Sequence, residues 1–270
     1  MTTTSKIDRS TDYVLDTGTD LGREQLECLE LLLDDHTTAA LAATGIRRGQ
    51  RCLEIGAGSG SIARWMADRV RPEGSVVAVD IETSRLTGGP TIDVRRHDLD
   101  DGVPDGGPFD LIHARLVLMH LRRRREIVTE LVDHLAPGGW LVLGEYLGPS
   151  FEPISAPSRA DADLFRNVVE VTINRVGRPA GISYEWAHEA DDFLVRAGLV
   201  NVHCERHLES TVGGGTGGIL YRNYIRQAWP LLLRAGLDEE DLERFCTLML
   251  DPRLRAWLFE FTSVRAQKPW

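Results

Sequence analysis

An apolar strand that runs directly into three alternating glycines constrains this 270-residue chain more than any other feature. The residues of this strand and turn are Leu53-Glu54-Ile55-Gly56-Ala57-Gly58-Ser59-Gly60. Glycine allows backbone angles that a Cβ would forbid and lets a ligand approach the main chain closely. A dinucleotide fingerprint would place its third glycine three positions after the second, where this chain has Ser61, so we expect a different nucleotide-like ligand.

Short apolar runs alternate with helical segments around this turn. Helical periodicity favours helices at residues 62–70 and 124–135. The runs that favour strands are 52–55, 75–79, 92–95, 109–114 and 140–144. Strands separated by helices pair in parallel through right-handed crossovers, so the expected fold class is α/β with a doubly wound sheet.

The rest of the chain divides into flanking segments. Leucines on one face predict a helix at 21–33, with a second at 38–43, and Pro and Ser mark a break at 149–157. Beyond it we expect helices to about 175 and at 189–197, 220–235 and 239–250, strands at 200–208 and 257–264, and a loop at 213–218. The predicted domains are a helical lid (1–48), a core (49–148), a helical insertion that forms a cap (149–198) and the C-terminal part of the core (199–270).

Charge and cysteine usage exclude several classes of protein. The formal net charge of -10 opposes binding to nucleic acid or to an anionic membrane, which require clustered Lys and Arg. The basic run 122–125 is interpreted as a solvated helix face. The four cysteines are scattered, so neither a metal site nor a disulfide framework is expected. With no apolar leader or membrane-length stretch, we expect a cytoplasmic protein.

The order of motifs resembles that of class I S-adenosylmethionine-dependent methyltransferases. Their first motif, an acidic residue followed after one position by Gly-x-Gly-x-Gly, is matched by Glu54 and the three glycines. The match continues through Asp80, Asp98, Phe109-Asp110 and the run Leu135-Ala136-Pro137-Gly138-Gly139-Trp140, and covers roughly residues 50 to 147. The resemblance implies a Rossmann-like, mostly parallel sheet of seven strands, with a helical N-terminal lid and an insertion after the fifth strand.

The same resemblance implies S-adenosylmethionine as cofactor. The acid at Asp80 would bind both ribose hydroxyls, Asp98 the adenine amino group, and the glycine turn the methionine moiety. Each aspartate alone could instead cap a loop. Tyr13 and Gln25 would cover the cofactor from the lid; the alternatives are a half-buried aromatic for Tyr13 and solvent exposure for Gln25. The full set of expected cofactor-binding residues is Tyr13, Gln25, Glu54, Gly56, Ala57, Gly58, Gly60, Asp80, Ile81, Asp98, Leu99 and Ala114.

Candidates for catalysis lie at the carboxyl edge of the predicted sheet, and they are His113, Arg115, His120, Glu145 and Tyr146. His120 could be a general base or could hydrogen-bond a loop that shapes the pocket. Arg115 could anchor a substrate anion or pair with a lid carboxylate, and Glu145 could face the acceptor or lie in a solvated loop. A structural role is expected for His113. In the insertion, family members place acceptor-specific residues where this chain has Tyr184, Trp186 and His188, although a surface helix is an alternative.

The predicted function is transfer of a methyl group from S-adenosylmethionine to an O, N or C atom of a small molecule, such as a bacterial secondary metabolite. The tail 213–269 is similar to bacterial methyltransferases of the quinone-biosynthesis group. Two alternatives remain: a cyclase or rearrangement enzyme that retains the cofactor, and a binding module without chemistry. Homodimer formation is left open.

Overall fold

The computed structural model describes residues 17–148 and 151–270. Five parallel strands form the first part of its sheet, in the spatial order β3-β2-β1-β4-β5. Their bounds are β1 Arg51–Ile55, β2 Ser75–Asp80, β3 Ile92–Arg96, β4 Phe109–Arg115 and β5 Leu135–Leu147. The reversal of strand order at β1 and β4 brings their carboxyl ends to the position where open α/β sheets bind ligands.

The sheet continues with antiparallel strands and has eight strands in the described residues, not the seven predicted. Strand β8 (Arg255–Gln267) pairs with β5 on one side and with β7 (Val200–Val212) on the other. Because β8 extends past the end of β5, its first residues need another partner. The short β6 (Pro153–Ser155), inside the segment predicted as a break, pairs with them and is the extra strand.

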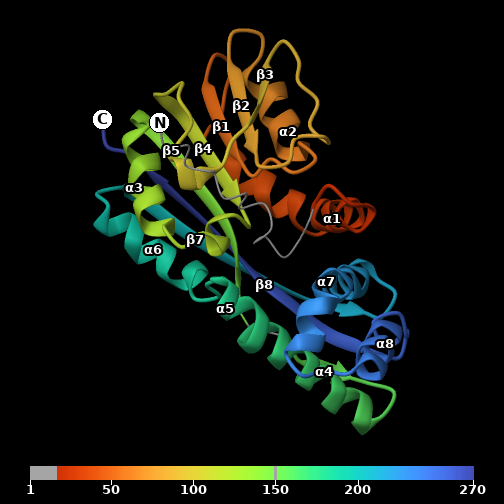
Figure 1. The fold of residues 1–270 in the computed structure, drawn as a ribbon. Coiled ribbons are helices and arrows are strands. Elements are labelled where there is room, and N and C mark those ends of the chain that lie inside the picture. The colour runs from red at the N-terminus through yellow and green to blue at the C-terminus, as the bar shows by residue number, and fades with distance from the viewer. Residues whose placement is uncertain (1–16, 149–150) are drawn as a thin grey trace, which may run out of the picture.

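Helices cover both faces of the sheet, as the doubly wound pattern requires (Figure 1). Side chains alternate along each strand, so Leu53 and Ile55 join one apolar cluster and Cys52 joins another. The first cluster includes α3 (Arg124–Asp133) and α6 (Trp186–Arg196), and the second includes α1 (Asp20–Ala42) and α2 (Ser61–Val70).

Helix α1 is continuous, whereas two helices were predicted. The polar stretch between them contains no Gly or Pro, and its side chains find partners inside the protein. Arg115 donates to Asp34 Oδ1 and to Thr37 Oγ1, at 2.8 and 3.0 Å. Thr19 caps the helix by accepting from the N–H of Gly22 at 3.0 Å.

A second group of helices gathers around the extended end of β8, away from β1 to β3 (Figure 1). Its members are α4 (Arg159–Val171), the π-helical turn Thr172–Gly177, α5 (Arg178–Ala180), α7 (Thr216–Arg234) and α8 (Glu239–Leu248). Except for the short α5, these elements contribute to one apolar cluster, which we call the cap cluster. The expected loop at 213–218 ends earlier, because Gly217 and Gly218 belong to α7. A Cβ on Gly217 would collide with Leu258, so glycine permits close packing on β8.

Candidate functional site

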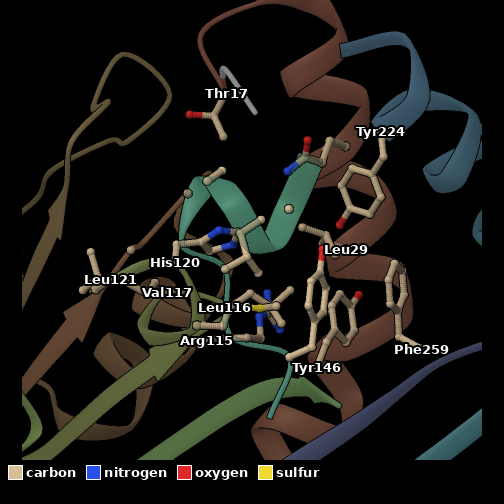
Figure 2. A pocket seen from close by; sticks show the side chains of 18 of the residues that line it. Thr17, Leu29, Arg115, Leu116, Val117, His120, Leu121, Tyr146, Tyr224 and Phe259 are labelled. Atoms are coloured by element: carbon tan, nitrogen blue, oxygen red, sulfur yellow. The ribbon is translucent and has the colours of Figure 1, made fainter. Parts of the chain in front are cut away.

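A cavity of about 940 Å³ lies between the carboxyl ends of the parallel strands and the helices of the cap cluster. Its volume is near the top of the roughly 300–1,000 Å³ range of small-molecule sites. One end is lined by the glycine turn and by residues after β2 and β3, and the other by the π-helical turn, α7 and β8. Figure 2 shows the middle of this cavity, with His120 facing Tyr146 and Phe259 across it in this view. The cavity therefore has room for a cofactor and a second molecule.

The glycine turn adopts a conformation that other residues would resist. Gly56, Gly58 and Gly60 have φ values of +65°, +56° and +85°. A Cβ on Gly56 would also collide with the side chain of Val117. Gly56, Ala57 and Gly58 line the cavity, whereas Gly60 is the N-terminal cap of α2 and lies outside the described wall. Two of the three glycines thus bring backbone to the cavity, and the third begins a helix.

Asp80 ends β2 beside this turn. Its Oδ2 accepts from the N–H of Gly58 at 2.8 Å and its Oδ1 from the N–H of Glu82 at 3.0 Å. Burial raises the pKa of Asp80, an effect that these backbone hydrogen bonds oppose. Each carboxylate oxygen has acceptor capacity left, so a pair of ligand hydroxyls could still bind. Ile81 lines the cavity next to Asp80, and its side chain is exposed. It offers an apolar surface on which a flat ring could lie.

Asp98 and Leu99 follow β3 and also line the cavity. Asp98 Oδ1 accepts from the N–H of Asp100 at 2.9 Å and so caps the short helix Leu99–Asp101. This is the loop-capping role considered for it from sequence. Asp98 remains on the same cavity wall as Asp80 and Ile81.

Glu54 forms a buried pair with His113 on the neighbouring strand. Nδ1 of His113 donates to Oε2 of Glu54 at 2.8 Å, and the two side chains are 1% and 4% exposed. The pairing follows from the sheet register, in which Glu54 lies opposite His113. Glu54 lines the cavity, while His113 does not, in the described wall. His113 therefore holds the carboxylate in place from behind.

His120 lies on the cavity wall in the turn after β4. Leu116 enters this turn with a φ of +56°, an unusual value for a residue with a side chain. Burial, assisted by the nearby charge of Arg124, lowers the pKa of His120 to about 4. The imidazole is therefore neutral at pH 7.

Glu145 supports that turn from behind. Its Oε1 accepts from the N–H of Leu118 at 3.0 Å, and the side chain lies in the interior rather than on the described cavity wall. Burial raises its pKa to about 8, against the backbone hydrogen bonds that lower it. Neither sequence alternative, an acceptor-facing acid or a solvated loop acid, describes this position: Glu145 positions the loop that carries His120.

The sequence is similar to those of known methyltransferases. A model of the methyltransferase domain matches residues 23–210. The chain belongs to the methyltransferase-domain family. It is 33% identical over 108 residues to methyltransferase str2 of Strobilurus tenacellus, covering 39% of this chain and 38% of that one. It is 31% identical over 139 residues to the ubiquinone/menaquinone biosynthesis C-methyltransferase of Laribacter hongkongensis, covering 46% and 52%. The chain thus spans about two fifths to one half of the length of these relatives.

A solved structure supports the same fold. The phosphoethanolamine N-methyltransferase 2 of Haemonchus contortus, determined with phosphomonomethylethanolamine and S-adenosylhomocysteine, aligns with a TM-score of 0.53 and 17% identity. The alignment covers 87% of this chain and 53% of that one. The methyltransferase-domain sheet is therefore the Rossmann-like sheet expected from sequence, with one strand more.

The other site residues predicted from sequence differ in whether they line the cavity of this methyltransferase domain. Arg115 pairs with Asp34 of α1 at 2.8 Å, which is the lid-carboxylate alternative. Gln25 is buried rather than exposed, lines the cavity, and accepts from Gln227 Nε2 at 2.7 Å. Ala114 is fully buried in β4 and lies outside the described cavity wall. Tyr13 lies outside the described residues.

Of the insertion residues singled out from sequence, Tyr184 lines the cavity. Trp186 is buried in the core and His188 is exposed on α6. An aromatic group lies at the far end of the cavity, and only its member Tyr146 was a candidate from sequence. Its members, which we call the aromatic wall, are Tyr146, Phe151, Tyr221, Tyr224 and Phe259. They come from β5, the segment after β5, α7 and β8. A local sequence pattern links only Tyr221 and Tyr224, whose spacing of three places them on one face of a helix.

Proposed function

We propose that the chain transfers the methyl group of S-adenosylmethionine to an O, N or C atom of a small molecule. The observation that carries this proposal is one continuous cavity, which joins the glycine turn and the strand-end acids to an apolar aromatic wall. The methyltransferase-domain match supports it, because residues 23–210 include the whole cofactor end of the cavity.

The residues present fit the cofactor. Asp80 would accept from the ribose hydroxyls, and Ile81 and Leu99 would contact the adenine, with Asp98 at its amino group. Gly56, Ala57 and Gly58 would meet the methionine moiety, whose ammonium suits the buried Glu54 carboxylate. Gln25 would close the site from α1. The sulfonium of the bound cofactor supplies an electrophilic methyl group.

The protein's own contribution would be positioning and exclusion of water. Arg115 fixes α1 over the site through Asp34, and Glu145 fixes the turn that carries His120. Holding an acceptor atom in line with the methyl group can supply most of the acceleration. His120, neutral at pH 7 but of low basicity, would accept a hydrogen bond from an acceptor hydroxyl or orient it.

The test uses methyl-labelled S-adenosylmethionine and a pool of candidate metabolites, followed by mass spectrometry of the products. Appearance of label in a small molecule, with stoichiometric S-adenosylhomocysteine, is the expected result. A converted metabolite that carries no label would instead support the cyclase or rearrangement alternative. Absence of binding to either form of the cofactor in calorimetry would overturn both.

The proposal extends to the roles of the domains, the location of the protein and its partners. We propose that the cofactor binds to residues 49–148 and that residues 149–198 help to cap the acceptor. We also propose that the protein acts in the cytoplasm, on a secondary metabolite, and does not bind nucleic acid. Within the described residues, no helix is long and apolar enough to cross a bilayer, and no cluster of side chains suits a metal ion. A homodimer remains to be tested by sedimentation.

A further inference from the structure

The two ends of the cavity differ in charge. All carboxylates of the described wall lie at the cofactor end or on α1 beside it; they are Glu30, Glu54, Asp80, Asp98 and Asp100. The end formed by the cap cluster and the aromatic wall has none among the described residues. The basic side chains of the described wall are Arg115, Arg122, Arg175 and Arg234. Arg175 and Arg234 are exposed beside the cap cluster, and Arg115 lies close enough to Tyr146 for its charge to act on that phenol. This separation occurs although acidic residues outnumber basic ones, 41 to 31, in the whole chain.

Two tyrosines of the aromatic wall have hydroxyl groups that lack a hydrogen-bond partner among the described residues. Tyr146 and Tyr221 are 6% and 7% exposed, and both hydroxyl oxygens are buried. A buried hydroxyl without a partner is unfavourable, because it has lost its hydrogen bonds to water. Burial raises the pKa of both phenols far above the ordinary value of 10, so each stays protonated and can donate. A ligand oxygen at this end would satisfy such donors.

The packing of the rings favours the same kind of ligand. Phe259 stacks with Tyr146 at 3.9 Å and with Tyr221 at 5.1 Å between ring centroids. Phe151 meets Phe259 edge-on at 4.1 Å. Stacking on Phe259 covers one face of Tyr146 and one face of Tyr221, and ring faces are the part of an aromatic side chain that attracts cations. Ring edges and hydroxyl hydrogens carry positive charge. An ammonium group placed here would lose its hydration without gaining a carboxylate.

We propose that the acceptor is an apolar, ring-bearing molecule, uncharged or anionic, whose oxygen accepts hydrogen bonds from Tyr146 and Tyr221, and that molecules bearing an ammonium group are excluded. This inference rests on the proposed function and names its substrate class. Arg175 and Arg234 favour an anionic group near the rim. Arg175 is held there by a hydrogen bond from its Nη1 to the carbonyl of Ala235 at 3.3 Å.

The test compares three probes that share a naphthalene ring and differ in charge: 2-naphthol, 2-naphthoate and 2-naphthylmethylammonium. Binding to the full chain saturated with S-adenosylhomocysteine is measured by calorimetry at pH 7.5. We expect the naphthol and the naphthoate to bind at least tenfold more tightly than the ammonium probe. Equal or tighter binding of the ammonium probe, or no binding of any probe, would overturn the proposal.

Variants assign the effect to individual groups. Tyr146→Phe and Tyr221→Phe should each weaken 2-naphthol threefold to tenfold. Thr262→Val is the matched control, because Thr262 also has a buried unpaired hydroxyl but lies outside the described cavity wall. Arg175→Gln and Arg234→Gln should weaken the naphthoate alone, with the exposed Arg226 of α7 as the site of a control substitution, Arg226→Gln. Unchanged naphthol affinity in both tyrosine variants would refute the role of the hydroxyls.

Failure of the proposed function can be told apart from failure of this inference. If S-adenosylhomocysteine does not bind, the methyltransferase proposal fails. The affinities of the same probes for the protein alone then still show which ligand charge the aromatic wall prefers. If the cofactor binds and the ammonium probe is favoured, the methyltransferase proposal stands and the substrate class proposed here is wrong.

Discussion

At the scale of single residues, the Glu54–His113 pair links the interior of the sheet to the end of the cavity where we propose that the cofactor binds. We expect His113→Leu to weaken S-adenosylhomocysteine about tenfold, because the Glu54 carboxylate loses the donor that orients it toward a ligand ammonium. 5′-Methylthioadenosine, which lacks the amino-acid portion, should bind within twofold of normal. Calorimetry with both ligands measures the difference.

His113→Asn is the matched control for that experiment, because the amide can still donate to Glu54 from a similar position. It should restore most of the affinity for S-adenosylhomocysteine. An equal loss for both ligands in His113→Leu, with altered circular dichroism, would show that the histidine only supports the sheet.

His120 gives a prediction about pH. An unfolded imidazole titrates near 6.5 and the folded one at about 4, so between these values the unfolded state binds a proton that the folded state does not. Stability should therefore fall as the pH falls through this window, by about 1–3 kcal/mol. His120→Asn should remove this dependence in urea denaturation at pH 7, 5 and 4. His188→Asn, at an exposed histidine, is the control, and an unchanged pH dependence in His120→Asn would contradict the assignment.

Residues differ in how well the sequence predicts their place. Gly56, Gly58 and Asp80 could be located because strand, turn and strand end are local patterns with a fixed relation in parallel sheets. Glu145 could not, because its direction depends on the turn after β4, whose strained Leu116 leaves no sequence signal. The tyrosines of the aromatic wall meet only through tertiary packing.

At the scale of elements, the ion pair between Asp34 and Arg115 helps to hold α1 over the cavity. Asp34→Asn should lower the free energy of unfolding by about 1–3 kcal/mol, since a largely buried guanidinium loses its anion. Amide exchange in α1 should also become faster, as measured by mass spectrometry. Asp35→Asn, one position along and exposed, should change stability by less than about 0.5 kcal/mol. Equal effects of the two substitutions would show that the pair contributes nothing specific.

The same ion pair explains an error of the sequence analysis. The polar stretch in the middle of α1 resembles a break because its residues lack apolar periodicity. Asp34 and Thr37 instead face Arg115 of β4, about 80 residues away in sequence. Helix α1 also contacts α7, where Asn223 Nδ2 donates to the carbonyl of Leu21 at 2.8 Å. Such distant partners cannot be seen in a local pattern.

At the scale of the whole molecule, β8 passes through both the core sheet and the cap cluster, so we expect the two to unfold together. Leu242 of α8 is fully buried in the cap cluster and lies outside the described cavity wall. Leu242→Ala should cost about 2–5 kcal/mol and lower the temperature of a single calorimetric transition. Two transitions, with only the first shifted, would show independent units.

The path of β8 has a consequence for how such a protein could acquire a new substrate. Because one uninterrupted strand carries Phe259 at the acceptor end and Val264 in the core of the sheet, the acceptor end cannot be exchanged as a separate module. A graft from another chain would have to preserve the pairing of β8 with both β5 and β7, and a slip of one residue would turn its core side chains to the opposite face. Diversification of this chain should therefore proceed by point changes on the aromatic wall rather than by recombination.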